Sequence, residues 1–484
     1  MIQQMQGFND FVNQVMDEWK VQGLAIAIIK DGEVVLSQGF GLRNVKEGLK
    51  ATSETLFAIG SCTKAFTTTA MGILVDEGKL DWDKPVRDYL PNFRMYDPYV
   101  TEHMTPRDLV THRSGLPRHD LLWYGASLTR EELFDRLRYL EPSKGFRSVY
   151  QYQNLMYMTA GYLVGQITDS TWEDFVQKRI LKPLGMENSN FSVTNSQESP
   201  DYALPYNKEE DKVSEIPFRN IDSMGPAGSI NSSVSDMSKW ILFHLEKEKQ
   251  DEKKIISEAN LNQTYTPQMV IQEPLKHDEL LNSSYGMGWF IQPYRGRGTT
   301  RHGGGIDGFS ALVSLMPHDN IGMVILTNLG GNPIPPIIAF NVYDRLLGLD
   351  QIPWNQRTKE QVEKSKEEAE KAKEKAAKKR KTGTQPSHPL EDYAGEFEHP
   401  GYGIISVEVE DDHLKGTYNS MSRALEHYHY DTFTIKMWNS TTKSAIAFSI
   451  DAHGNIGSLS ISMEPAVKPI VFNRKESGDN SGEQ

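Results

Sequence analysis

The chain has 484 residues, with 52 Lys and Arg against 65 Asp and Glu, which gives a formal charge of −13 at pH 7. This acidic balance argues against a nucleic-acid-binding protein, because such proteins usually present a basic surface. The single cysteine, Cys62, excludes an internal disulfide framework and a cysteine-based zinc site.

Residues 1–355 mix strand and helix signals. Two runs of β-type residues, 24–29 and 34–38, flank Asp31-Gly32, a dipeptide that is typical of a hairpin turn. Helices are predicted over 63–77, 130–137, 155–167 and 234–245, and further strands over 312–315 and 322–326. Because strands lie at both ends of this region with helices between them, we expect an α+β domain whose N- and C-terminal strands share one antiparallel sheet.

A charged linker is predicted over residues 356–384. Residues 357–381 hold 11 Lys and Arg and 6 Glu with no Pro or Gly, and several Glu stand four positions before a Lys, the order that favours a helix. We interpret this segment as a solvated helical spacer roughly 35 Å long, at a rise of about 1.5 Å per residue.

The rest of the chain shows a third pattern. Residues 385–475 contain short strands separated by turns, which predicts a small antiparallel sandwich or barrel. The expected strands are 404–410, 413–418, 432–437, 445–450, 458–462 and 470–473. Residues 476–484 are a polar tail that we expect to be disordered.

Targeting and cofactor signals are weak throughout. The N-terminus shows no basic segment followed by an apolar one, and the longest apolar runs fall far short of the ~20 residues that cross a bilayer. We therefore expect a cytoplasmic protein that contacts neither a membrane nor nucleic acid. No cofactor or metal is expected either, since His427-x-His429 lacks a third ligand.

The first chemical signal is the stretch Gly60-Ser61-Cys62-Thr63-Lys64. Ser61 and Lys64 are three residues apart, so both side chains lie on one face if Ser61 opens a helix. A serine hydroxyl is a weak nucleophile that needs an adjacent base, and an uncharged lysine can act as one. A capping serine followed by a solvated lysine explains the same pair. Cys62 is a rival nucleophile, although a cysteine in this position more often packs into a core.

Two later motifs can complete such a site. Tyr152-x-Asn154 precedes an apolar helix and can place a phenol beside the lysine and an amide near a substrate carbonyl. Residues 302–305, His-Gly-Gly-Gly, enter a strand, where glycines let a ligand approach backbone N–H groups. Taken singly, the first motif is better explained by an aromatic strand or loop pair, and the second by a glycine turn.

Together, in this order and at these intervals, the three motifs resemble those of the serine β-lactamase and penicillin-binding protein superfamily. The likeness is greatest to the class C type branch, with its D-Ala-D-Ala carboxypeptidases, D-aminopeptidases and esterases. It extends over about residues 10–345 and includes landmarks at 39–41, 104–117, 181–186 and 225–228. The resemblance implies a β-lactamase-like fold, in which an antiparallel sheet is flanked by helices and joined by a helical subdomain.

The resemblance also implies a role for each site residue. Ser61 is the acylated nucleophile, and Lys64 shares its proton. Tyr152 is the general base of acylation, and Asn154 binds the acyl-side amide. Backbone N–H groups of Ser61 and Gly305 form the oxyanion hole.

One motif departs from the family pattern. His302-Gly303-Gly304 takes the place of the family's Lys-Thr-Gly strand motif, so the resemblance assigns His302 to the catalytic group and Gly304 to the substrate-binding edge. The Lys-Thr pair of class C lactamases helps to bind the substrate carboxylate, whereas a histidine with pKa near 6.5 is mostly neutral at pH 7. We therefore expect weak or no β-lactamase activity and a closer relation to the peptidase and esterase branches.

The module at residues 385–475 resembles the lipocalin-like β-barrel that follows this catalytic domain in some D-amino-acid peptidases, with a generic β-domain as the alternative. In such relatives the barrel can cap the active site or build an oligomer. Restricted substrate access and a homo-oligomer formed through the C-terminal β-domain are therefore expectations for this chain.

Several functions fit these residues. The leading hypothesis is a serine hydrolase that acts through an acyl-enzyme on short peptides or amides containing D-amino acids. The alternative enzyme is a carboxylesterase with the same catalytic residues. A non-catalytic protein that binds peptides or β-lactams is the alternative outside the enzymes. A zinc hydrolase is disfavoured, because the sequence holds no helical pair of histidines.

Overall fold

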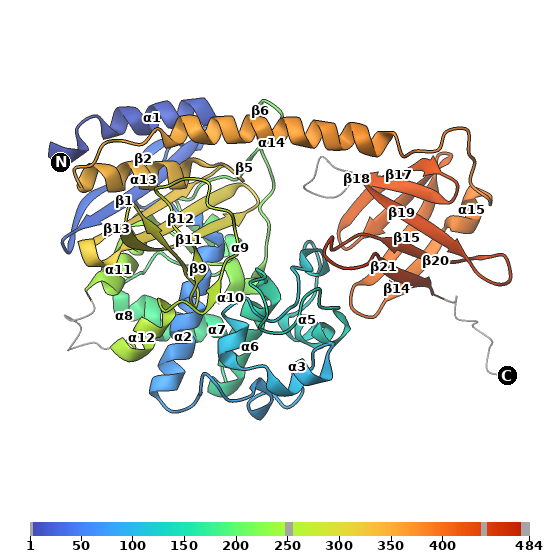
Figure 1. Ribbon diagram of the computed structural model, residues 1–484, viewed down its shortest axis with the longest axis horizontal. Coiled ribbons are helices and arrows are strands. Elements are labelled where there is room, and N and C mark those ends of the chain that lie inside the picture. Colours follow the sequence, from blue (N-terminus) through green and yellow to red (C-terminus); the bar gives the residue numbers. More distant parts are fainter. Residues whose placement is uncertain (1–2, 247–254, 437–442, 476–484) are drawn as a thin grey trace. The chain divides into compact units, whose positions relative to one another are not determined.

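The structure is a computed structural model, and it describes residues 3–246, 255–436 and 443–475 (Figure 1). It contains two compact units. The first comprises residues 1–93, 102–115 and 145–362, and the second comprises residues 94–101, 116–144 and 363–484. Segments from the middle of the chain thus group with its C-terminal part, and the linear domain boundaries expected at residues 355 and 385 stay predictions.

The first unit is built on a nine-stranded antiparallel sheet with the order β3-β2-β1-β13-β12-β11-β10-β9-β8. In that order the strands are Leu49–Lys50, Glu33–Asn44, Gly23–Lys30, Ile321–Thr327, Phe309–Met316, Arg297–Ile306, Phe290–Tyr294, Ser284–Tyr285 and Met269–Val270. β1 pairs with β13 from Leu24 opposite Thr327 to Lys30 opposite Ile321. The predicted sharing of one sheet by the two ends of the region is confirmed.

Short sheets and helices connect these strands. The two-stranded sheets are β4 (Phe57–Ala58) with β7 (Asn231–Ser232), and β5 (Tyr206–Glu209) with β6 (Lys212–Glu215). The helices of the first unit are α1 (Phe8–Trp19), α2 (Lys64–Asp76), α4 (Pro106–Leu109), α6 (Asn154–Thr168), α7 (Trp172–Val176), α8 (Lys182–Leu184), α9 (Val193–Glu198), α10 (Gly225–Gly228), α11 (Val234–Leu245), α12 (Glu258–Thr264) and α13 (Ile334–Leu346). The helices predicted over 63–77, 155–167 and 234–245 are confirmed as α2, α6 and α11.

Helices cover both faces of the large sheet (Figure 1). On one face, α1 and α13 share a buried core with Ile26 of β1 and Met323 of β13. On the other face, α11 packs so closely that a Cβ at Gly322 would lie 2.3 Å from Ile241. Since both faces are covered, β1 is apolar along its length and does not alternate with polar residues.

The second unit contains a closed barrel of eight antiparallel strands, β14–β21. The strands are Gly395–His399, Gly403–Glu410, His413–Tyr418, Met421–His429, Thr432–Lys436, Lys443–Ile450, Ile456–Ile461 and Ile470–Arg474. The predicted C-terminal β-module is therefore confirmed as a barrel. The sequence did not predict β14 and β17, because each buries few side chains; β17, for example, buries only Met421 and Leu425. The end of one predicted strand, Met437, and the predicted disordered tail at 476–484 lie outside the described residues.

Residues 116–144 belong to the unit of the barrel and contact it through polar groups. The backbone N–H of His119 donates to Glu464 Oε2 at 2.9 Å, and Tyr418 Oη donates to the carbonyl of Leu121 at 3.1 Å. This segment contains α5 (Arg130–Arg136), close to the predicted helix, and α15 (Leu390–Tyr393) precedes the first barrel strand.

Two helices have residues in both units, namely α3 (Pro98–His103) and α14 (Trp354–Ala377). α14 confirms that the charged linker is helical, and the described side chains from residue 363 to its end are exposed. Throughout the described ranges, no helix combines the length and the apolar character needed to cross a membrane.

Candidate active site

Ser61 lies in the turn that leads into α2. This turn is a 3₁₀ segment, Gly60–Thr63, from which α2 continues directly. Gly60 has a φ of 51°, in the left-handed region that favours glycine. A Cβ at this position would lie 2.6 Å from the backbone nitrogen of Gly305, so the turn meets β11 backbone to backbone. A glycine at position 60 is therefore needed to bring Ser61 beside β11.

Lys64 is completely buried at the start of α2, where its side-chain nitrogen has three oxygen acceptors. Nζ donates to Ser61 Oγ at 3.0 Å, to Asn154 Oδ1 at 2.9 Å and to the carbonyl of Ala227 at 2.8 Å. These acceptors suit the N–H groups of a charged lysine. An uncharged amine also fits, because it would donate to Asn154 and Ala227 and accept the proton of Ser61. The geometry therefore allows a proton to move from the hydroxyl to the amine.

Tyr152 places its ring against the same lysine. Nζ of Lys64 lies 4.9 Å from the ring centroid of Tyr152 and 5.3 Å from that of Tyr157. Such aromatic faces attract an ammonium group, most strongly where water is excluded. The ring of Tyr152 also lies 4.3 Å from that of His112 and 6.2 Å from that of His302. Tyr152 thus belongs to one cluster with the predicted lysine and histidine.

Asn154 is the first residue of α6, and this position directs its side chain to Lys64. Gln153 caps the helix with its side-chain oxygen. The backbone before the helix is held by His112, whose carbonyl accepts from Gln151 N–H at 2.8 Å and whose Nδ1 accepts from Gln153 N–H at 3.1 Å. Since Nδ1 accepts, the proton of neutral His112 is on Nε2.

A buried carboxylate locks the loop that carries His112. Asp108 accepts from Arg113 Nε at 2.5 Å and from Arg147 Nη2 at 2.6 Å, and it closes a capping box with Thr105 at the start of α4. Burial acts to raise the pKa of Asp108, but the two arginines outweigh it and hold the pKa below its ordinary value. Asp108 therefore stays charged and fixes the backbone on which Tyr152 and Asn154 depend.

His302 is buried, with 1% of its surface exposed, and its ring is neutral at pH 7, as expected from the sequence. Burial, assisted by the charge of Lys64, lowers its pKa to about 3. Nδ1 lies 2.6 Å from the carbonyl of Gly303, which can only accept, so Nδ1 carries the proton. Nε2 then accepts from the hydroxyl of Tyr285 at 3.1 Å. Both ring nitrogens are thus used inside the protein.

The glycine run lies inside β11, so the interpretation as a simple glycine turn is wrong. A Cβ at Gly304 would lie 1.9 Å from the carbonyl oxygen of Ile59, whereas a Cβ at Gly305 would meet no atom within 4 Å. Gly304 therefore permits the close approach of β11 to the turn of Ser61. Beside Gly305 the space is open, which leaves room for a substrate.

Cys62, the rival nucleophile, points away from this space. Its thiol donates to the backbone carbonyl of His302 at 3.2 Å, and the side chain is 2% exposed. Burial raises the pKa of the thiol to about 12, so it stays protonated at neutral pH. The structure therefore supports the packing interpretation of Cys62.

Three aromatic residues of the cluster were not singled out from the sequence. They are His112, Tyr157 and Tyr285. Tyr157 donates to the carbonyl of Val110 at 2.6 Å, and burial raises the pKa of Tyr157 and of Tyr285 above the usual range. These residues come from separate elements and have no local motif, so only the fold reveals them.

The structure brings the predicted residues of the site to one place. They are Ser61, Lys64, Tyr152, Asn154, His302, Gly304 and Gly305. Together they supply a hydroxyl, a lysine in contact with it, a phenol and backbone N–H groups, which are the parts that acyl transfer needs. Within the described ranges, no group of three or more His, Cys, Asp or Glu is placed to hold a metal ion.

Comparisons with known proteins cover both parts of the chain. The family model described as "Beta-lactamase" matches residues 8–342, and one described as "Domain of unknown function (DUF3471)" matches residues 379–474. Among curated proteins, the unguisins hydrolase ungD' of Aspergillus campestris is 27% identical over 427 residues, which cover 83% of this chain and 77% of that protein.

Solved structures that share the fold include the following two. The octameric penicillin-binding protein homologue from Pyrococcus abyssi matches with a TM-score of 0.63 at 24% identity, covering 97% of this chain and 100% of the other. The D-amino acid amidase from Ochrobactrum anthropi SV3 matches with a TM-score of 0.59 at 20% identity, covering 70% of this chain and 99% of the other.

Proposed function

Because the chain belongs to the beta-lactamase family and is a serine hydrolase, we propose that it hydrolyses amide bonds in short peptides or amides that contain D-amino acids. The reaction proceeds through an acyl-enzyme on Ser61. The observation that carries the proposal is the contact of 3.0 Å between Lys64 Nζ and Ser61 Oγ, because it gives the hydroxyl the adjacent base it needs.

Acylation uses each residue of the cluster. Ser61 Oγ forms a bond to the carbonyl carbon while its proton passes by way of Lys64 to Tyr152, the general base. The N–H groups of Ser61 and Gly305 stabilise the negative oxygen of the tetrahedral intermediate. Tyr152, beside Lys64, relays the proton to the leaving nitrogen, and the C–N bond breaks. Asn154 binds the amide on the acyl side.

Deacylation reverses the roles. A water molecule attacks the ester carbonyl carbon and gives up one proton to Tyr152, beside Lys64. The bond between the carbonyl carbon and Ser61 Oγ then breaks, and the proton returns to Ser61. The products are a carboxylic acid and the amine released in the first step, so each cycle consumes one water.

The neutral state of His302 supports the choice of substrate. A neutral imidazole offers no fixed positive charge where the related lactamases use a lysine to bind a carboxylate, so substrates with an amide or an uncharged leaving group suit the site better. The D-amino acid amidase with the same fold is consistent with an amide substrate.

A substrate panel tests the proposal. We expect the full chain to hydrolyse D-phenylalanine amide faster than L-phenylalanine amide, D-Ala-D-Ala or p-nitrophenyl acetate. Ser61→Ala should lower the rate by about 10⁴-fold or more, whereas Ser214→Ala, at an exposed serine on β6, should not. Full activity of Ser61→Ala would refute the acyl-enzyme.

The same neutral histidine also suits ester substrates, so a carboxylesterase is the second candidate. Turnover of p-nitrophenyl acetate without cleavage of any amide would make the esterase the correct assignment. If Ser61 forms no adduct with a fluorophosphonate or a penicillin and nothing is turned over, a binding protein is the remaining interpretation.

The proposal includes a homo-oligomer formed through the barrel. The fold match to an octameric protein over 97% of this chain supports it. Light scattering on the full chain measures the mass of the particle, and a mass of 54.8 kDa, that of one chain, would contradict the oligomer.

A further inference from the structure

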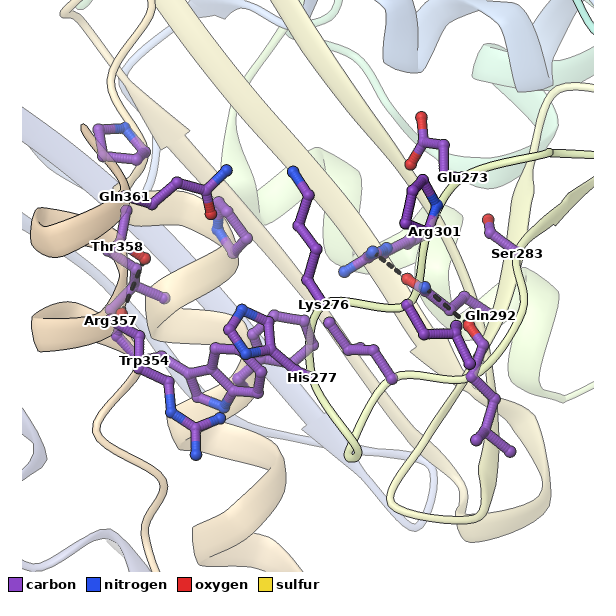
Figure 2. A pocket seen from close by; sticks show the side chains of 18 residues that line it. Glu273, Lys276, His277, Ser283, Gln292, Arg301, Trp354, Arg357, Thr358 and Gln361 are labelled. Atoms are coloured by element: carbon purple, nitrogen blue, oxygen red, sulfur yellow. Dashed lines mark hydrogen bonds between the residues drawn. The ribbon is translucent and has the colours of Figure 1, made fainter. Parts of the chain in front are cut away.

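A hollow of about 280 Å³ lies in the first unit (Figure 2), and Ser61 is not among the residues that line it. It is lined by the loop between β8 and β9, by β10 and β11, by α13 and by the first turns of α14. Its volume is close to the lower end of that of small-molecule sites, about 300 Å³. The hollow is therefore large enough for a small organic ligand.

The hollow lies on the opposite side of the sheet from the nucleophile, as the direction of its lining residue Arg301 shows. Successive side chains of a strand point to opposite faces, and Arg301 directly precedes His302 on β11. His302 faces Tyr152, while the guanidinium of Arg301 lies 5.4 Å from the ring centroid of Phe340 on α13. The hollow and the candidate active site are thus separated by the thickness of the sheet.

The guanidinium of Arg301 has an amide as its partner and no acid. It is partly buried and donates to Gln292 Oε1 at 2.5 Å, and no carboxylate of the described residues forms an ion pair with it. Burial lowers the pKa of Arg301, as expected for a guanidinium that is withdrawn from water.

Neighbouring arginines differ from Arg301 in this respect. Arg295 pairs with Asp344 at 3.0 Å, Arg357 pairs with Glu279 at 3.0 Å, and Arg297, on the same strand as Arg301, pairs with Asp319. An arginine withdrawn from water without an acid is costly unless something else supplies the negative charge.

The other walls of the hollow fit a ligand with an apolar body. Trp354 meets His277 edge to face, with ring centroids 5.0 Å apart, and its ring is tilted against that of Phe340 at 4.8 Å. Ile337 and Leu280 extend this apolar surface. The lining also contains the exposed Lys276, and its one carboxylate is Glu273. The site therefore joins an aromatic wall to an excess of positive charge.

We propose that this hollow binds a small organic carboxylate, with the carboxylate on Arg301 and an aromatic or aliphatic body against Trp354 and Phe340. Planar guanidinium and carboxylate groups form paired, charge-assisted hydrogen bonds, and the apolar wall removes the body of the ligand from water. The ligand is not a substrate, because the nucleophile lies on the other face of the sheet.

Binding is measured by calorimetry on the full-length Ser61→Ala protein, so the result does not depend on turnover. The probes are 3-phenylpropionate and 3-phenylpropanamide, which share a phenyl body and differ in charge. We expect the carboxylate to bind about tenfold more tightly than the amide, since charge-assisted hydrogen bonds are stronger than neutral ones. Equal binding of the two probes, or no binding of either, overturns the proposal.

Variants locate the site. Arg301→Met should abolish the preference for the carboxylate, and Arg297→Met, on the same strand, should leave it unchanged. If Arg301→Met does not fold, Lys276→Glu at the exposed edge decides, because it should weaken 3-phenylpropionate and spare 3-phenylpropanamide. A preference for the carboxylate that survives both Arg301→Met and Lys276→Glu contradicts the proposal.

The wild-type protein separates this hollow from the active site. Labelling of Ser61 with a fluorophosphonate fills the active site and should not change the affinity for 3-phenylpropionate. Loss of binding after labelling would show that the carboxylate occupies the active site instead.

Discussion

Two adjacent residues of β11, Arg301 and His302, face opposite sides of the same sheet. They differ in charge and in the hydrogen-bond partners that surround them. His302 is neutral, and both of its ring nitrogens have hydrogen-bond partners inside the protein. Arg301 keeps its charge and faces a hollow without an acidic partner among the described residues. A closed set of hydrogen bonds indicates a fixed framework, whereas an uncompensated charge at a hollow indicates a ligand.

The largest effect is expected when Lys64, which lies on the same side of the sheet as His302, is replaced. Lys64→Met should lower kcat/KM for D-phenylalanine amide by about 10³- to 10⁴-fold, because Ser61 loses its base. Binding of 3-phenylpropionate on the other face should not change. The exposed Lys79→Met is the control. A rate within tenfold of wild type would remove Lys64 from the mechanism.

The second test uses pH, since the pKa of His302 is lower in the folded state than the ordinary 6.5. Between about pH 6.5 and pH 3, the histidine is protonated in the unfolded chain and stays neutral in the folded protein. The free energy of unfolding therefore decreases as the pH falls through this range. His302→Gln should lack this loss, which amounts to about 3 kcal/mol between pH 6.5 and pH 4. Urea unfolding at pH 7, 5 and 4 measures the difference between the two proteins.

The control for this test is His413→Gln, at an exposed histidine of the barrel. It should follow wild type at each pH. A constant difference between wild type and His302→Gln from pH 7 to pH 4 would mean that His302 titrates normally in the folded protein.

The third test separates β11 from the turn of Ser61. Gly304→Ala places a methyl group where the carbonyl of Ile59 lies 1.9 Å away, so the strand must move from the nucleophile. We expect about 10²-fold loss of kcat, the size of a lost oxyanion contact. Gly298→Ala, on the same strand with no atom within 4 Å of its Cβ, should keep full activity. Equal rates for the two variants would contradict the backbone contact.

The smallest effect is expected on the Arg301 side. Arg301→Met should raise the free energy of unfolding by about 1 kcal/mol, because it removes a partly buried charge that no acid balances. Chemical denaturation measures this, with Arg297→Met as the paired control. A marked loss of stability would show that Arg301 holds the fold and that the contrast with His302 is wrong.

Much of the fold was predictable, because local patterns carry it. The hairpin signal at Asp31-Gly32, the helix from Lys64 and most barrel strands follow from periodicity and turn residues. The weak strands β14 and β17 were missed, since few of their side chains face the core.

The candidate site was predictable where its parts lie close in sequence. Ser61 and Lys64 share a helix face, and Tyr152 and Asn154 share one short segment. The ion pairs by which Asp108 holds the loop beneath the site were not predictable, because its partner Arg147 lies 39 residues away in the sequence. That Arg301 has no acidic partner among the described residues was equally hidden, since this depends on which side chains β10 and α13 bring to it.

The contacts between residues 116–144 and the barrel have a consequence for how the protein is made. His119 and its partner Glu464 are 345 residues apart. At about 5 to 20 residues per second, the ribosome needs roughly 20 to 70 seconds to deliver the second after the first. During that time, residues 116–144 have left the ribosome and the barrel strands that they contact have not. A message that is cut short before the barrel therefore yields a nucleophile and its lysine, but leaves this middle segment without the surface that completes it.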